Sequence, residues 1–176
     1  MARQQKPQAS EAPANPAPRK TLLERMAEWL DANEWQYDSH PEKDYISTTC
    51  KLKDVAARVF VEFADSDEWH RALAFTSYPV RVPEARRTAV ADALNRINYS
   101  LVYGSFEMDM DDGEVRFRTV VESDTDMNDA MFERVLNSNL AVADRHFAPL
   151  MAIAFGNAAP ATVLDLSGPA EKQVLQ

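Results

Sequence analysis

The stretch GSFEMDMDDGEVRFRTVVE, residues 104–122, decides the fold because it has the pattern of a two-stranded hairpin. An Asp-Gly pair between alternating apolar residues is a strong turn signal, and we predict a two-residue turn at Asp112-Gly113. The resulting register sets two opposite-charge pairs directly across the ladder, Glu107 with Arg118 and Asp109 with Arg116. The other face is apolar and contains Phe106, Met108, Met110, Val115 and Phe117.

The five carboxylates within residues 107–114 also raise the question of a calcium loop. An EF-hand loop needs oxygen ligands at positions 1, 3 and 5, glycine at position 6 and glutamate at position 12. A loop that starts at Glu107 has Asp112 at position 6 and Arg118 at position 12, and a start at Asp109 fits no better. Cross-strand arginines explain the carboxylates, so we expect no metal site here.

A second hairpin is predicted upstream, in VAARVFVEFADSDEWHRALAFTSY, residues 55–78. This run is β-branched and aromatic, and a turn at Ser66-Asp67 would divide it into two strands. One face then holds small and apolar side chains on which a helix can pack closely: Ala57, Val59, Val61, Phe63, His70, Ala72 and Ala74. The other face is mixed, with large apolar residues among charges: Arg58, Phe60, Glu62, Trp69, Arg71, Leu73 and Phe75.

The mixed face has two interpretations. A sheet covered by helices on one side leaves a polar face on the other, so a half-apolar face predicts that something else covers it. Alternatively, the register is shifted by one residue and this face is itself the core. Both interpretations stay open at the level of sequence.

Three helices are predicted around the two hairpins. Thr21 and Glu24 form the pattern of a capping box at the start of the first helix. Pro83 suits the first turn of the second, whose apolar stripe runs through Ala89, Val90, Ala93, Leu94, Ile97 and Leu101. The third is expected to begin after a cap at Asp124 or Asp126 and to be kinked or split at Pro149. A short strand is expected before Lys51.

These elements predict an α+β domain with about five strands, in the order α-β-β-β-α-β-β-α. We assign the domain to residues 21–156, preceded by a disordered Pro- and Ala-rich tail at residues 1–20 and followed by a flexible tail at residues 157–176. The chain has no apolar run of the roughly 20 residues that a membrane helix requires. Its single cysteine, Cys50, excludes an internal disulfide, and a cytoplasmic setting is the default expectation.

The charge distribution limits the class of partner. The chain has a net charge of −9, and residues 1–20 carry +3, which leaves −12 for the remainder. An acidic body repels phosphate, so we expect neither nucleic acid nor an anionic membrane surface as the main ligand.

Residue patterns typical of catalysis are missing from the sequence. The three histidines fall in different predicted elements without metal-ligand spacing, and the four glycines form no phosphate-binding motif. No serine or threonine lies in a nucleophile elbow. We therefore expect no catalytic residues, no metal and no cofactor, and predict that the protein is not an enzyme.

The run VPEARRTAVADALNRINYSLVYGSFEMDMDDGEVRFRTVV, residues 82–121, resembles the YbjN family, which is described as bacterial sensory transduction regulators. The matching motifs are Val82-Pro83-Glu84, Arg86, Ile97-Asn98, Gly104 and residues 111–118, with Asp144, Phe147 and Pro149-Leu150 further on. The resemblance extends over residues 22–156. It implies a mostly antiparallel sheet with helices packed on one face, as in type III secretion chaperones.

The resemblance also implies a non-enzymatic role in binding protein partners, often as a dimer, and supplies no catalytic residues. Our first hypothesis is therefore a protein-binding or regulatory module that acts through the mixed face of residues 58–75 or as a homodimer. The alternatives are a small-molecule sensor or unrecognised enzyme with a pocket between sheet and helices, and a structural dimerisation domain.

Overall fold

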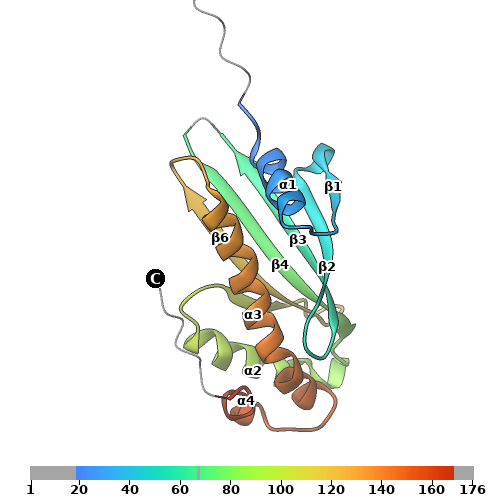
Figure 1. Cartoon of the computed structure of the whole chain (residues 1–176). Helices are drawn as coiled ribbons and strands as arrows, with labels where there is room; N and C mark the ends of the chain where they lie inside the picture. The colour runs from blue at the N-terminus through green and yellow to red at the C-terminus, as the bar shows by residue number, and fades with distance from the viewer. Residues whose placement is uncertain (1–18, 67, 169–176) are drawn as a thin grey trace, which may run out of the picture.

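The computed structural model describes residues 19–66 and 68–168, which form an α+β domain (Figure 1). The strands are β1 (Asp38–His40), β2 (Tyr45–Lys51), β3 (Ala56–Asp65), β4 (His70–Arg81), β5 (Ser105–Met108) and β6 (Glu114–Ser123). The helices are α1 (Leu22–Ala32), α2 (Glu84–Ser100), α3 (Asp129–Ala154) and α4 (Val163–Leu166), with 3₁₀ turns η1 (Pro41–Lys43) and η2 (Pro160–Thr162). The six strands form one antiparallel sheet in the order β1-β2-β3-β4-β6-β5. This confirms the predicted fold class, with β1 and β2 in place of one short strand.

The β3–β4 hairpin has the predicted faces but not the predicted turn. Asp65 pairs with His70, so four residues separate the strands instead of two. The Ser66 hydroxyl accepts a hydrogen bond from the Trp69 amide at 3.0 Å, which stabilises the longer turn. A shift of two residues keeps every side chain on its face, because the side-chain period of a strand is two. The alanine-containing face is buried, and the alternative of a one-residue shift is wrong.

The β5–β6 hairpin also has a longer turn than predicted. Asp109 pairs with Glu114, its carboxylate accepts from the Asp111 amide at 2.8 Å, and its carbonyl accepts from the Gly113 amide at 2.8 Å. Such a loop needs a left-handed residue at its end, and Gly113 has φ +79°. Met110 therefore lies in the loop, 51% exposed, and not on the apolar face.

The new register changes the charge pairing in this hairpin. Glu107 faces Arg116 and contacts it at 2.9 Å, and it also reaches Arg118 diagonally at 3.0 Å. The predicted pair of Asp109 with Arg116 is not formed. One glutamate thus pairs with both arginines, and these charges lie on the surface of the sheet.

The helices begin and end close to the predicted residues, with two differences. The capping box of Thr21 and Glu24 is present at the start of α1. The cap of α3 is Asn128 instead of Asp124 or Asp126, because the Asn128 side chain accepts from the Met131 amide at 3.1 Å. Pro149 is buried within α3, and the helix runs through it without a split.

The core has two parts, and α3, which lies along the sheet in Figure 1, contributes to both. The part that we call the α1 cluster joins α1, the inner face of β2–β4 and the first half of α3. The other part, the α2 cluster, joins α2, the inner faces of β5 and β6 and the second half of α3. Between them, fully buried Asn139 donates to the carbonyl oxygens of Ala74 and Phe117, which attaches α3 to β4 and β6.

The domain extends beyond its predicted end at residue 156. Residues 157–168 include η2 and α4, and Val163 is fully buried in the α2 cluster. Arg145 donates to the carbonyl oxygen of Gly168 at 2.6 Å. The predicted N-terminal tail lies outside the described residues, except for Arg19 and Lys20. No helix in the described part of the chain is long and apolar enough to cross a membrane.

Candidate protein-binding face

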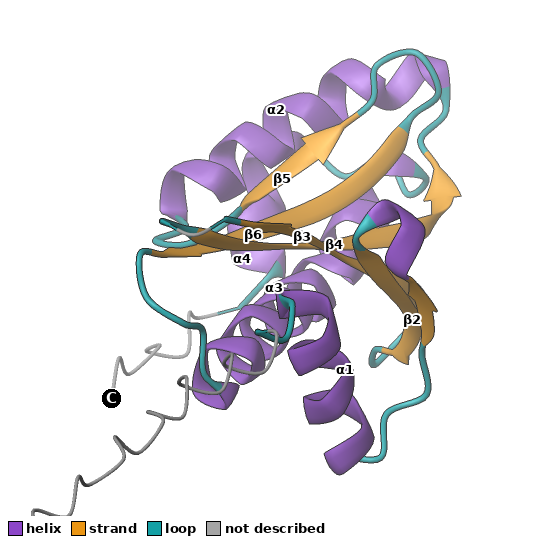
Figure 2. Cartoon of the chain, turned by 90° about the horizontal axis from the view of Figure 1, so that it is seen from above, coloured by secondary structure: helices purple, strands orange, loops and turns teal. Residues whose placement is uncertain are grey.

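The side of the sheet opposite the helices, which we call the outer face, carries all seven residues that the sequence suggested for partner binding. Each strand alternates, so the residues between the buried ones point to this side. Within residues 19–66 and 68–168, the buried side chains of α1, α2 and α3 belong to the two core clusters and pack with inner-face residues. Figure 2 shows α1 and α3 on one side of the sheet and α2 alongside the edge strand β5. The seven residues are Arg58, Phe60 and Glu62 of β3, Trp69 of the turn, and Arg71, Leu73 and Phe75 of β4.

The apolar side chains of the outer face are exposed to different degrees. Trp69 is 43% exposed, whereas Phe60 and Leu73 are half-buried. Phe75 is 8% exposed because it lies at the centre of the sheet, opposite Phe60 and beneath the Arg116 guanidinium. The face thus has a buried aromatic centre and a more exposed aromatic end.

Arginine side chains lie over three of the aromatic rings. The guanidinium carbon is 4.8 Å from the ring centre for Arg58 on Phe60, 5.5 Å for Arg71 on Trp69 and 4.4 Å for Arg116 on Phe75. A guanidinium is weakly hydrated and stacks on aromatic faces, so it covers apolar surface while it remains charged. Both the apolar area and the charge of this face remain available to a partner.

The outer face is larger than the sequence predicted. Tyr45 of β2 lies 6.3 Å from Phe60 between ring centres, and His40 of β1 stacks on Tyr45 at 4.3 Å. On the other side, β6 adds Val120, which is 40% exposed and pairs with Leu73. Local patterns identify the outward residues of each hairpin, but they do not say that β4 pairs with β6.

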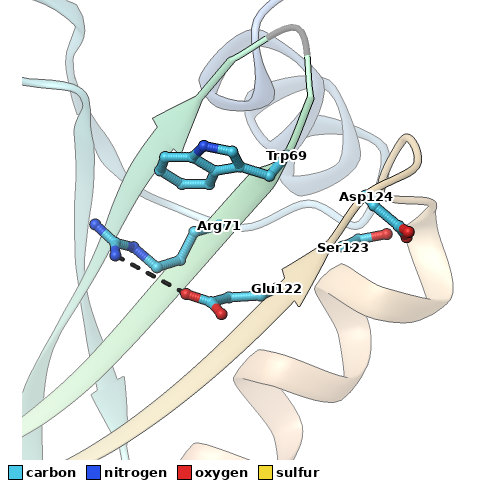
Figure 3. Close-up of a pocket in the computed structure, with 5 residues that line it drawn as sticks. All are labelled: Trp69, Arg71, Glu122, Ser123 and Asp124. Atoms are coloured by element: carbon cyan, nitrogen blue, oxygen red, sulfur yellow. Dashed lines mark ion pairs between the residues drawn. The ribbon is translucent and has the colours of Figure 1, made fainter.

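A shallow hollow of about 390 Å³ marks the exposed end of this face (Figure 3). Its lining residues are Trp69, Arg71, Glu122, Ser123 and Asp124, and we call it the Trp69 hollow. Arg71 pairs with Glu122 across the strands at 3.9 Å, and Asp124 follows the end of β6. The hollow therefore combines one exposed indole with two carboxylates and one guanidinium.

The buried polar groups of the described residues are all engaged with one another. Every buried side-chain nitrogen or oxygen there has a hydrogen-bond partner, and no three His, Cys, Asp or Glu side chains gather as metal ligands. Tyr78 donates to the Ala143 carbonyl at 2.6 Å, and burial raises its pKa. Burial also raises the pKa of the Cys50 thiol, which opposes thiolate formation.

The comparisons with known proteins agree with the resemblance seen in the sequence. A family model described as "YbjN: Putative bacterial sensory transduction regulator" matches residues 22–151. Among solved structures, the "Crystal structure of YbjN, a putative transcription regulator from E. coli" is similar in fold, with a TM-score of 0.50 and 16% identity. That match covers 78% of this chain and 95% of the other. No curated protein matches the chain.

Proposed function

Because the chain belongs to the YbjN family, we propose that it is a non-enzymatic regulator that binds a protein partner through the outer face of its sheet. The observation that carries this proposal is an uncovered sheet face with aromatic and aliphatic side chains at its centre and one end. An antiparallel sheet with one free face normally alternates apolar and polar residues cleanly. Here Phe60, Leu73 and Val120 occupy outward-facing positions, where the fold itself requires only polar side chains.

The chemistry of the face suits a protein partner. Trp, Tyr, Phe and Arg are the residue types enriched at protein interfaces, and the outer face combines all four. Opposite charges along β3, Arg58 and Glu62, would set the orientation of a bound segment. A second copy of the chain is one such partner, since a two-fold contact brings a mixed-charge face against itself.

The alternative of a small-molecule sensor or enzyme has less support from the structure. Such a site would be a concave pocket with convergent polar groups between the sheet and the helices. That space is filled in the described residues by Asn139 and its hydrogen-bonded neighbours Thr76 and Thr119. No observation on the structure favours a particular small ligand.

The test compares two variants that each change two apolar residues to aspartate. Leu73→Asp with Val120→Asp alters a facing pair at the middle of the outer face. The matched control, Tyr99→Asp with Val102→Asp, alters side chains that are 94% and 90% exposed at the end of α2. Sedimentation equilibrium measures self-association, and affinity capture with isotope-labelled quantification measures other partners.

We expect the association constant of the face variant to fall at least about tenfold, because burying carboxylates at an interface costs more than about 1.4 kcal/mol of binding free energy. The control variant should retain it. Circular dichroism and urea unfolding establish that both variants are folded. Equal binding by the two folded variants would place the interaction elsewhere on the protein.

A further inference from the structure

The chain enters the described structure beside the Trp69 hollow. Arg19 donates from Nη2 to Nε2 of His70 at 2.8 Å and forms an ion pair with Asp126. His70 directly follows Trp69, and Asp126 lies two residues after Asp124. His70 is itself buried and held by Asp65 through its Nδ1. Arg19 is therefore anchored at the end of the sheet where the hollow opens.

The residues that precede Arg19 have the composition of a polyproline II ligand. The sequence Pro-Ala-Asn-Pro-Ala-Pro occupies residues 13–18, and these residues lie outside the described part of the structure. A polyproline II helix has three residues per turn, so Pro13 and Pro16 would share one face of it. Arg19 follows at the same spacing of three and is the residue held by Asp126.

The Trp69 hollow has the groups that such a segment needs. Aromatic surfaces bind proline rings in polyproline II recognition, and Trp69 is 43% exposed with Arg71 over its ring. Glu122 and Asp124 provide negative charge; residues 13–18 are themselves uncharged, and the cationic Arg19 follows them directly. The indole and the anchored Arg19 thus flank the path that the prolines would follow.

The distances allow the segment to reach the hollow. Polyproline II advances about 3.1 Å per residue, so the three residues from Pro16 to Arg19 span roughly 9 Å. The segment needs only to pass the end of one sheet, whose layer with side chains is about 10 Å thick. A tether this short gives an effective concentration in the millimolar range, which makes even a weak contact populated.

We propose that residues 13–18 dock in the Trp69 hollow, with Pro13 and Pro16 against the indole and Arg19 as the anchor. The segment then covers the exposed end of the outer face. If the outer face binds a partner as proposed above, the segment competes for Trp69 and Arg71. The docking itself requires no partner and is tested on the purified full-length chain.

The experiment places a photo-cross-linking residue, p-benzoylphenylalanine, at Ala14 of the full chain. We expect cross-links to the tryptic peptides of residues 59–71 and 119–134, which contain the lining of the hollow. Trp69→Ser should reduce the yield at least about fivefold, since truncation of an anchoring tryptophan costs more than 1 kcal/mol. Asp124→Lys should also reduce it, whereas Tyr99→Ser should leave it unchanged.

A mixture of ¹⁴N- and ¹⁵N-labelled chains separates links within one molecule from links between two. Links to the hollow within one molecule, lost with Trp69→Ser, support the docking, whereas links to the hollow only between two molecules overturn it, because the short tether acts within one chain. Links spread over other peptides, or a yield that Trp69→Ser and Asp124→Lys leave unchanged, overturn it. Neither result depends on the partner experiment, so the two proposals fail independently.

Discussion

His146 is a buried, uncharged histidine, and its surroundings fix its tautomer. The Ser167 hydroxyl donates to the Val163 carbonyl at 2.7 Å, so it accepts from Nδ1 of His146 at 2.8 Å. Burial, with a smaller effect from Arg145, lowers the pKa of His146 to about 4. A second proton on this ring would therefore be an uncompensated charge inside the α2 cluster.

The lowered pKa predicts a loss of stability in acid. The unfolded chain binds a proton at this ring below about pH 6.5, whereas the folded chain does so only near pH 4. The stabilisation is therefore complete above pH 6.5 and is lost as the pH falls from 6.5 through 4, by roughly 3 kcal/mol in total.

His146→Gln removes the titrating ring and keeps an amide that can donate to Ser167. We expect urea unfolding at a series of pH values to show a shallower acid decline for this variant. Other carboxylates titrate in both proteins, so the difference between the two curves isolates His146. Parallel curves between pH 6.5 and 4 would mean that the ring accepts its proton equally well in the folded state.

The free edge of strand β5 is closed by a side chain from α2. Phe106 and Phe117 form a pair in which the backbone groups of Phe106 point away from β6. Asn98 at the end of α2 accepts from the Phe106 amide at 2.8 Å and donates to its carbonyl at 3.0 Å. One amide side chain thus replaces a neighbouring strand and satisfies an otherwise open sheet edge.

Asn98→Ala should therefore lower the free energy of unfolding and open the edge. We expect a loss of about 1–3 kcal/mol in urea unfolding, together with concentration-dependent self-association in sedimentation velocity. The matched control is Asn95→Ala, an exposed position on the same helix, which should stay within about 0.5 kcal/mol of wild type. Equal effects of the two substitutions would remove the edge-closing role of Asn98.

The turns show which parts of an element the sequence predicts. Alternation identified the inner and outer residues of β3 and β4, and the pairs Ser66-Asp67 and Asp112-Gly113 indicated where the chain reverses. Both predicted turns are nevertheless two residues shorter than the observed ones, because the Ser66 and Asp109 side chains stabilise longer loops. Such side-chain bonds to the backbone depend on local geometry, which residue type alone does not determine.

Across the whole molecule, the sequence did not predict the contacts between segments that are distant along the chain. The pairing of β4 with β6 places Leu73 beside Val120 and creates the Trp69 hollow from two hairpins. Likewise, α4 packs because Arg145 and His146 bind its C-terminal end, although its short sequence has no helical periodicity long enough to detect. The sequence identified the residues of the outer face that lie on β3 and β4. The residues on β1, β2 and β6 could be assigned to this face only once the strand order was known.

The two core clusters should lose their structure together. Because α3 contributes Leu136 to the α1 cluster and Leu150 to the α2 cluster, damage to one should be transmitted to the other. Leu136 is 1% exposed, and Leu136→Ala should lower the free energy of unfolding by about 2–5 kcal/mol. We expect native-state hydrogen exchange to show the same loss of protection for amides of α2 and of the β6 residues Val115 and Phe117, whose side chains belong to the other cluster.

Val102→Ala, at a side chain that is 90% exposed, provides the control and should change protection by less than about 0.5 kcal/mol. If the α2 and β6 amides keep wild-type protection in Leu136→Ala while those of α1 lose it, the two clusters open as separate units. A single helix through both clusters argues against that result, since unfolding of either half of α3 frees the hydrogen bonds of Asn139 to β4 and β6.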